Sequence, residues 1–257
     1  ILSGLVGSEM CIRDRAQTVE DFELLIVGDG VTENVRAVGR ELCATDRRIR
    51  FLDFPKGERK GERHRHTALS TARGRIVAYL GDDDIWFPDH LAALSVLLRD
   101  ADFGHTLHLG LDACGAPFVL ASDLSIPLLR RRMLHRLFNT FDLTFGGHTL
   151  AAYRRLPLGW HTTPPAFPWT DLWMWRQFLA QPWCRAATAP LVTALCSQTH
   201  LRPHMSDVAR AAELAVWRAR TNEPGFEAEI GRLATAAFNA QLAPLLAPLP
   251  LHLRAVL

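Results

Sequence analysis

The chain has 257 residues, of which 48% are hydrophobic, and a formal net charge of +2 at pH 7. This length suits one large domain with an appendage, and the near-neutral charge gives no indication of a nucleic-acid-binding protein. No apolar run approaches the roughly 18 residues that a membrane-spanning helix needs. The five cysteines are far apart and form no Cys-x-x-Cys pair, which argues against a zinc site or a disulfide scaffold and predicts a reducing, cytoplasmic location.

Residues 1–15 show neither the period of a strand nor that of a helix. The run is similar to a translated sequencing adaptor, so we expect a non-native or disordered leader and leave it out of the fold.

From Ala16 onward, expected strands and helices alternate. The patterns predict a strand over 22–27 ended by Gly28-Asp29-Gly30, a helix over 32–44, a strand over 49–54, a charged loop over 55–65, a helix over 66–73 and a strand over 76–80. This βαβαβ order predicts a parallel sheet with right-handed crossovers.

Three aspartates, Asp82-Asp83-Asp84, follow the strand over 76–80, and Pro88 suits the first turn of the next helix. Adjacent carboxylates repel one another unless water solvates them or a cation lies among them. Their oxygens are the natural ligands of Mg²⁺ or Mn²⁺. The plain alternative is a solvated turn that caps the next helix, a role that we assign to Asp84. Asp29 falls at the same carboxyl edge of the sheet, so the two acidic turns should converge.

The second half of the chain is expected to mix strands and helices. Two antiparallel strands are predicted over 105–111 and 117–120, helices over 126–137, 172–179, 207–220 and 226–242, and a further strand over 191–195. The Pro-broken tail after Ala243 is expected to be peripheral.

The stretch from Ala16 to Leu91 resembles the nucleotide-binding half of a family-two glycosyltransferase of the GT-A fold. Four blocks carry the resemblance: Gln17 to Gly30; Arg65-His66-Thr67-Ala68-Leu69 with Ala72-Arg73-Gly74; Tyr79 to Leu91; and Thr170-Asp171-Leu172-Trp173. Two departures stand out. The family's first strand should precede Gln17, where residues 1–15 lie, and His66 stands where Asn is usual.

The resemblance implies an α/β fold, a Rossmann-like three-layer sandwich of nucleotide-diphospho-sugar transferases with a mostly parallel central sheet. It also implies a division of the chain. Residues 16–98 would form the nucleotide-sugar-binding half, residues 99–204 the acceptor-side half of the same domain, and residues 205–257 a C-terminal helical extension.

The activity implied by the resemblance is transfer of a sugar from a nucleoside-diphosphate sugar, with a UDP-sugar favoured, to an acceptor hydroxyl with inversion. Mn²⁺ or Mg²⁺ would neutralise the leaving diphosphate. Asp83 is the expected metal ligand, and Asp82 beside it would contact the metal or the ribose. Asp171 would act as the general base, and its plain alternative is a helix N-cap.

Further positions are expected to contact the donor. Asp29 would accept a hydrogen bond from the nucleotide base, unless it only forms a turn. Arg63 and Arg65 would pair with phosphate oxygens, unless they are solvated loop residues, and His66 would hydrogen-bond with a titratable side chain. In the loop after the strand over 191–195, Arg202 would close over the diphosphate and His200 would join it or the metal. The acceptor side would be lined by His148, Trp160 and Trp169.

Other functions stay open at this stage. A nucleotidyltransferase also uses carboxylate-bound Mg²⁺, although no Gly-rich triphosphate loop is visible. A truncated or degenerate domain would bind a sugar nucleotide without turnover. A receiver-type phospho-acceptor domain is disfavoured by the length of the chain beyond Leu98.

Overall fold

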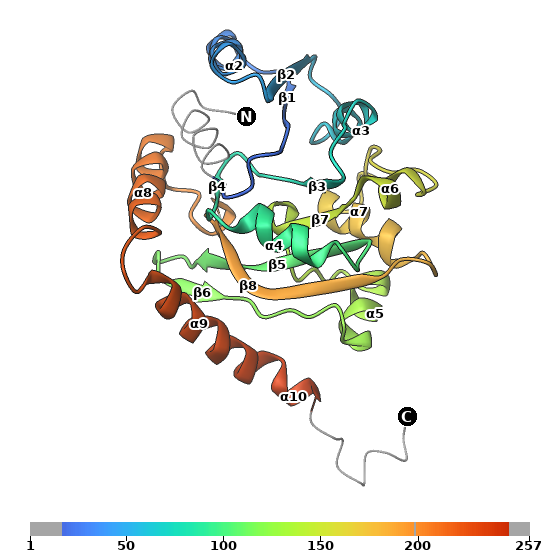
Figure 1. Cartoon of the computed structure of the whole chain (residues 1–257), viewed down its shortest axis with the longest axis vertical. Coiled ribbons are helices and arrows are strands. Elements are labelled where there is room, and N and C mark those ends of the chain that lie inside the picture. Colours follow the sequence, from blue (N-terminus) through green and yellow to red (C-terminus); the bar gives the residue numbers. More distant parts are fainter. Residues whose placement is uncertain (1–16, 198, 247–257) are drawn as a thin grey trace.

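The protein is described here from a computed structural model covering residues 17–197 and 199–246. Its described strands form two separate sheets (Figure 1). In the smaller sheet, β1 (Leu24–Asp29) pairs in parallel with β2 (Ile49–Phe54), and α2 (Glu33–Thr45) connects them. Leu42 of α2 and Ile49 are the buried centre of a small apolar cluster here. This sheet therefore rests on a small core of its own.

The larger sheet has six strands: β3 (Ile76–Ala78), β4 (Asp84–Trp86), β5 (Phe103–Leu111), β6 (Pro117–Val119), β7 (Gly146–Thr149) and β8 (Ala186–Cys196). Its order is β3-β7-β5-β8-β4, with β6 paired to β5. β5 and β8 run parallel, and the other strand pairs of this sheet among the described residues are antiparallel.

The α/β class agrees with the sequence, but the pairing of strands is mixed rather than mostly parallel. The strand expected over 76–80 does not join β1 and β2 in one sheet, because β3 pairs with β7 in antiparallel orientation. Hydrophobic pattern predicts that a strand forms, whereas its neighbour is chosen by contacts between distant segments.

Helices cover both faces of the larger sheet. Successive residues of a strand point to opposite faces. A Cβ at Gly146 would lie 2.6 Å from the ring of Trp175 in α7 (Thr170–Leu179), and one at Gly147 would lie 3.1 Å from Leu94 in α4 (His90–Leu97). The two glycines of β7 thus let α7 and α4 approach from opposite sides, which gives the three layers that the sequence predicted.

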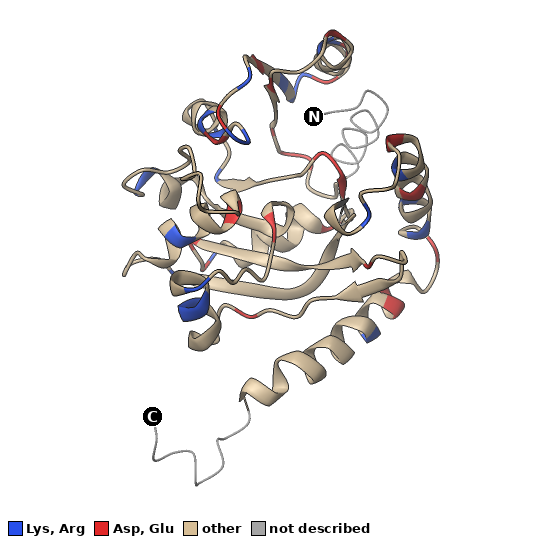
Figure 2. Cartoon of the chain, turned by 180° about the vertical axis from the view of Figure 1, so that it is seen from behind, with Lys and Arg blue, Asp and Glu red and all other residues tan. Residues whose placement is uncertain are grey.

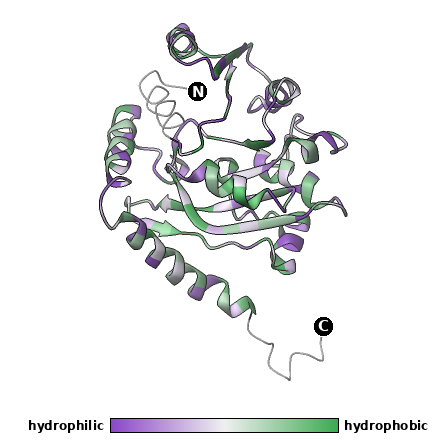
Figure 3. Ribbon diagram, viewed as in Figure 1, coloured by the Kyte–Doolittle hydropathy of each residue, from purple (hydrophilic) through white to green (hydrophobic). Residues whose placement is uncertain are grey.

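An aromatic core lies between the sheet and α7. The rings of Phe103 and Phe178 stack with centroids 4.9 Å apart, and Trp175 packs 5.2 Å from Phe103. All three side chains are fully buried, and each such burial contributes roughly 1.5–3 kcal/mol. Figure 3 shows the accompanying apolar residues along α4 and β8.

Two long helices, α8 (Asp207–Arg220) and α9 (Phe226–Gln241), lie along one side of the molecule beside the larger sheet (Figure 1). Leu214 of α8 and Ile230 of α9 join an apolar cluster with Leu109 and Leu195 of the sheet. A short helix, α10 (Ala243–Leu246), follows. The predicted helix over 207–220 is confirmed to the residue.

The remaining elements are α3 (Glu62–Ser70), α5 (Pro127–His135), η1 (Leu143–Phe145), α6 (Leu150–Arg154) and η2 (Thr199–Leu201). α3 begins earlier than predicted, at Glu62, because Gly61 takes a left-handed φ of 65° that ends the preceding loop. The strand predicted over 191–195 is part of the longer β8, and β4 was not predicted.

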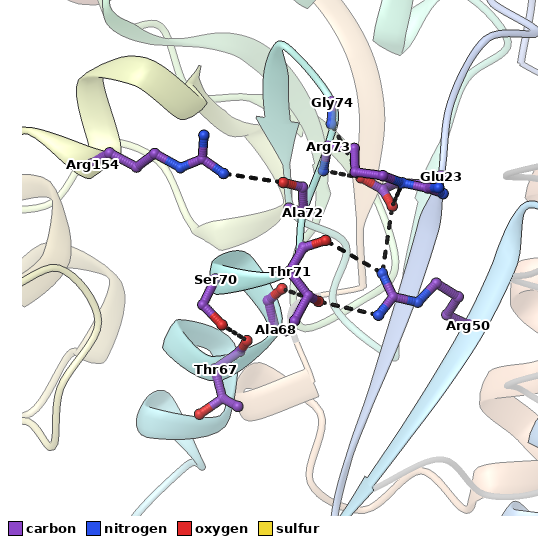
Figure 4. Close-up of polar contacts among 10 residues, drawn as sticks. All are labelled: Glu23, Arg50, Thr67, Ala68, Ser70, Thr71, Ala72, Arg73, Gly74 and Arg154. Carbon is purple, nitrogen blue, oxygen red and sulfur yellow. Dashed lines mark hydrogen bonds and ion pairs between the residues drawn. The ribbon is translucent and has the colours of Figure 1, made fainter.

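Glu23 fastens the smaller sheet to the segment between α3 and β3 (Figure 4). Its carboxylate accepts hydrogen bonds from the backbone amides of Arg73 at 2.5 Å and Gly74 at 3.1 Å. Arg50 of β2 forms an ion pair with Glu23 at 3.7 Å and donates to the hydroxyl of Thr71 at 3.2 Å. One carboxylate thus connects β1, β2, the end of α3 and the start of β3.

Some expectations fall outside the described residues: the leader over 1–15, the family's first strand before Gln17 and the end of the tail. Within the two described ranges, no helix combines the length and the apolarity needed to cross a membrane.

Candidate active site

The acidic turn joins β3 to β4, and Figure 2 shows it as a red loop beside the larger sheet. Asp84 is the first residue of β4 and is only 6% exposed. The hydroxyl of Thr144 donates to its carboxylate, and the backbone amide of Ser197 donates at 3.2 Å. The expectation that Asp84 caps the next helix was wrong, because Asp89 occupies the N-cap position of α4.

Carboxylates crowd around this turn. Burial raises the pKa of Asp84 well above its usual range, and the charges of Asp83 and Asp142 add to the rise. Burial also raises the pKa of Asp142, against a hydrogen bond from the Cys196 thiol and the favourable charge of His200. Asp142 was not singled out from the sequence, because it lies in a segment without a motif.

The donor set fits a divalent cation. Asp82 and Asp83 present carboxylate oxygens in the turn, and a cation would relieve the repulsion among Asp83, Asp84 and Asp142. Among the residues that the structure describes, no group of three or more His, Cys, Asp or Glu side chains is arranged to hold a metal alone. Ions of this kind are commonly held by one or two carboxylates together with substrate phosphates.

Asp171 is the second residue of α7, and Trp169 holds the N-cap position. Its carboxylate accepts a hydrogen bond of 2.7 Å from the side-chain amide of Asn139. Burial raises the pKa of Asp171 to about 6, and the charge of Asp142 adds to the rise. A carboxylate that titrates near neutral pH can take a proton from a hydroxyl and release it again.

Asp29 is the last residue of β1, which continues two residues beyond the predicted strand end at Val27. Its carboxylate accepts the backbone amide of Gly57 at 2.6 Å and the ammonium of Lys56, and His64 lies 3.4 Å away. Although burial opposes the change, the Gly57 and Lys56 contacts lower the pKa of Asp29. Asp29 is thus an ionised acceptor that also orders the loop between β2 and α3.

Arg65 is within electrostatic range of three carboxylates, Glu62, Asp29 and Asp171, of which Glu62 contributes most. Its guanidinium is 5.0 Å from the centroid of the Trp160 ring. One terminal nitrogen is buried without a hydrogen-bond partner among the described residues. A buried donor of this kind is suited to an anionic ligand.

The other two predicted positions of α3 lie at its surface. Arg63 is exposed. His66 is bonded through Nδ1 to the hydroxyl of Tyr153 at 2.8 Å. The structure therefore gives Arg65, rather than Arg63, the environment of a ligand-binding cation.

The late loop differs from the expectation for Arg202. Its guanidinium is buried and donates to Glu213 of α8 and to the carbonyl of Ser197, both at 2.6 Å. These contacts anchor η2 to α8, and Nε of Arg202 is buried without a hydrogen-bond partner among the described residues. His200 is exposed and within electrostatic range of Asp142.

Two of the three expected acceptor-side residues belong to the core instead. His148 is fully buried and bonded to the Tyr79 hydroxyl at 2.7 Å, which in turn accepts the indole N–H of Trp160 at 2.8 Å. Trp160 is 3% exposed, whereas Trp169 is 42% exposed beside Asp171. The hydrophobic pattern of the sequence could not distinguish a core position from an exposed position beside the site, because aromatic residues occur in both.

Comparisons with known proteins give consistent matches. The family model described as Glycosyl transferase family 2 matches residues 11–158. A UDP-Glc:alpha-D-GlcNAc-diphosphoundecaprenol beta-1,3-glucosyltransferase, WfgD of Escherichia coli, is 36% identical over 87 residues, which cover 33% of this chain and 32% of the relative. Succinoglycan biosynthesis protein ExoW of Rhizobium meliloti is 36% identical over 93 residues, covering 34% and 28%. An uncharacterized glycosyltransferase of Rickettsia felis is 29% identical over 87 residues, covering 34% and 14%. The chain thus spans less than a third of the length of these relatives.

Solved structures share the fold. S. aureus TarS 1-349 in complex with UDP-GlcNAc matches 92% of this chain and 68% of its own, with a TM-score of 0.57 and 14% identity. A mannosyltransferase from Pyrobaculum calidifontis in complex with GDP-Man and Mn²⁺ matches 95% and 68%, with a TM-score of 0.56 and 18% identity.

Proposed function

Because this chain belongs to glycosyl transferase family 2 and has the α/β GT-A fold that its sequence predicted, we propose that it transfers a sugar from a nucleoside-diphosphate sugar to an acceptor hydroxyl. A UDP-sugar is the favoured donor, since relatives named for or bound to UDP-sugars are among the matches. The observation that carries the proposal is the grouping of Asp83, Arg65 and Asp171, each with the environment that one step of such a transfer needs.

The donor side of the proposal uses the first half of the chain. Asp29 accepts a hydrogen bond from the nucleotide base, and Arg65 pairs its buried, unpartnered nitrogen with a phosphate oxygen. Arg63 and His66 contribute at the rim of the same site. Asp83, with Asp82 and His200, holds Mn²⁺ or Mg²⁺, and a bound cation neutralises the charge that develops on the departing diphosphate. The Mn²⁺ in the mannosyltransferase structure supports this assignment.

Asp171 carries the acceptor side of the proposal. It removes the proton of the acceptor hydroxyl while that oxygen attacks the anomeric carbon from the face opposite the diphosphate. The bond between the sugar and the diphosphate breaks as the new glycosidic bond forms, which inverts the configuration. The pKa of Asp171, about 6, leaves most of its carboxyl groups ionised at neutral pH.

The proposed division of the chain follows from these roles. Residues 16–98 bind the donor, residues 99–204 carry the acceptor side, and residues 205–257 are an extension. Pairing of β4 with β8 supports one shared domain for the first two parts. The cysteines of the described ranges are free thiols, which supports a reducing, cytoplasmic location.

The test combines ligand binding with turnover. Melting temperatures are measured with UDP, GDP and their sugars, with and without Mn²⁺, for wild type, Asp83→Ala, Asp171→Asn and the exposed control Asp100→Ala. A nucleotide at about 100 times its Kd stabilises by about 2.7 kcal/mol, which raises Tm by about 5–10 °C at this size. We expect this Mn²⁺-dependent rise in every protein except Asp83→Ala.

Release of nucleoside diphosphate from the matching sugar nucleotide should be lost in both Asp83→Ala and Asp171→Asn and kept in Asp100→Ala. Folded wild-type protein that responds to no nucleotide, or full turnover by Asp171→Asn, would contradict the proposal. Release of pyrophosphate from a nucleoside triphosphate would favour a nucleotidyltransferase.

A further inference from the structure

Asn139 lies between α5 and η1, in a stretch that no motif marks. Its Nδ2 donates to Oδ2 of Asp171 at 2.7 Å. Its Oδ1 is buried and has no hydrogen-bond partner among the described residues. The side-chain amide is therefore oriented by its bond to Asp171, at the cost of leaving its own carbonyl oxygen unpaired.

The segment that carries Asn139 is fixed to the helix that carries Asp171. Arg176 of α7 donates to the carbonyl of Met133 at 2.8 Å and to that of Arg136 at 2.6 Å. Carbonyls at a helix end lack partners within the helix, so these bonds satisfy the end of α5 and tie it to α7. Arg176 thus connects α7, which carries Asp171, to the end of α5, which precedes Asn139, and this connection keeps the two side chains close together.

We propose that Asn139 is a positioning residue for the transfer reaction, whose side-chain amide orients the carboxylate of Asp171 toward the acceptor hydroxyl. This inference rests on the proposed role of Asp171 as general base. A misdirected base loses much of its rate even when its chemistry is intact. An unpaired buried carbonyl lowers the stability of the fold. Such groups are tolerated at functional sites, and the contact of Asn139 with the reactive carboxylate is consistent with that explanation.

The same bond acts on the charge of Asp171. Burial raises its pKa and the charge of Asp142 adds to the rise, whereas the backbone amides of Leu172 and Asp171 and, after them, the side-chain amide of Asn139 lower it. The other charged group that acts on Asp171 from a neighbouring element is Arg65 of α3. On α7 itself, Arg176 is bonded to α5, and Trp173 donates its indole N–H to Nε2 of His161. Asn139 is the side-chain donor to this carboxylate, so its removal should be visible in the titration of Asp171.

The decisive variants are Asn139→Ala, which removes the amide, and Asn139→Asp, which replaces the donor with a second carboxyl group. The matched control is Thr140→Val, because Thr140 is the next residue, is buried, and bonds Ser122 at 2.7 Å instead of Asp171. The full chain is labelled with ¹³C-aspartate, and the Asp171 carboxyl resonance is assigned by its loss in Asp171→Asn.

In Asn139→Ala the midpoint of the Asp171 titration should rise by about one pH unit. In Asn139→Asp the two carboxyls should titrate as a coupled pair with one step raised further. Thr140→Val should match wild type. An unmoved midpoint in Asn139→Ala, or an equal shift in Thr140→Val, would overturn the inference.

Turnover of the sugar nucleotide adds a second readout. Asn139→Ala should lower kcat by roughly ten- to a hundredfold near pH 6.5 with little change in the KM of the donor, and the loss should shrink at higher pH as Asp171 becomes ionised. A raised KM with unchanged kcat would also overturn the inference. The titration needs no sugar nucleotide, so an inactive wild type would count against the proposed function alone. The titration would still show whether Asn139 acts on the carboxylate of Asp171.

Discussion

Asp83 and Asp84 are neighbours in the chain but lie in different environments. Asp83 is half-buried in the turn, whereas Asp84 begins β4 and is bonded to Thr144 and Ser197. Burial and the charge of Asp83 raise the pKa of Asp84, which favours the neutral form of its carboxyl group. The turn thus separates a carboxylate available to a cation from a carboxyl group that holds the turn in place.

The environment of Asp84 predicts that two substitutions at this position lower the free energy of unfolding by different amounts. Asp84→Asn keeps a neutral group of the same shape and should lower the free energy of unfolding by less than about 1 kcal/mol. Asp84→Ala leaves the buried hydroxyl of Thr144 and the amide of Ser197 without this acceptor, which should cost about 2–3 kcal/mol. Urea unfolding of both variants measures the two values, and an equal cost would contradict the neutral state of Asp84.

At the residue scale, the sequence predicted the side chains that belong to motifs and missed those that support them. Asp29 and Asp171 lie at the strand end and the helix start where their motifs placed them. Asn139 and Thr144 come from a segment without a motif and reach the site only through folding. Arg202 has the residue type of a phosphate ligand, but its partner Glu213 lies on a helix whose approach no local pattern reveals.

The unit of β1, α2 and β2 is an element with few apolar contacts of its own. Its buried apolar residues in the small cluster are Leu42 and Ile49, and Leu25 of β1 packs against the main core. Polar contacts such as those of Glu23 add to this attachment (Figure 4). Segments with little buried apolar surface open at lower free energy than a core does. We therefore expect this unit to open before the larger sheet.

Glu23→Ala tests this expectation. Loss of the acceptor for the amides of Arg73 and Gly74 should lower the free energy of unfolding by about 1–2 kcal/mol and speed amide hydrogen exchange in β1, α2 and β2. The matched control is Glu33→Ala in α2, where Glu33 forms only exposed ion pairs. If exchange changes equally in both variants, or chiefly in the larger sheet, the attachment does not depend on Glu23.

Element types were more predictable than element neighbours. The long amphipathic helices α8 and α9 follow their sequence pattern closely, because one apolar face repeats over several turns. β4 escaped prediction because it is three residues long and contains Asp84, and it forms through pairing with the distant β8. The pairing of β3 with β7 was not predicted either, because β7 is also distant in the sequence.

The whole molecule buries several neutral histidines. Burial lowers the pKa of His90 and His108 to about 3 and that of His105 and His148 to about 4. In the unfolded chain these groups titrate near 6.5. Their contribution to stability is complete above that pH and is lost as the pH falls toward the folded values, because the unfolded state binds protons that the folded state excludes. Asp171 acts in the opposite direction, since its pKa is raised.

A histidine variant isolates this effect from that of the carboxyl groups. His108 stacks on Phe145 with centroids 4.2 Å apart, and Phe can keep that stacking without titrating. The loss of stability between about pH 7.5 and about pH 5 should be smaller in His108→Phe than in wild type by about 2 kcal/mol. Urea unfolding at both pH values measures it, with the exposed His135→Phe as control. Equal pH dependence in His108→Phe and wild type would mean that His108 is protonated in the fold.

At this scale the sequence predicted the fold through the resemblance of the stretch from Ala16 to Leu91 and the α/β alternation, and the solved structures agree. It could not predict the split into two sheets, because the position of a strand in a sheet depends on which edges meet after collapse.

The separation of β1 and β2 from the larger sheet also bears on how specificity can diverge. Asp29, the proposed contact to the nucleotide base, belongs to the smaller sheet, whereas Asp171 belongs to α7 above the aromatic core. On the proposed roles, substitutions around Asp29 that keep the contact of Leu25 with the main core would alter recognition of the base without repacking α7. Recognition of the base and of the acceptor would then be separable, and grafting residues 24–54 from a relative offers a route to exchange one while keeping the other.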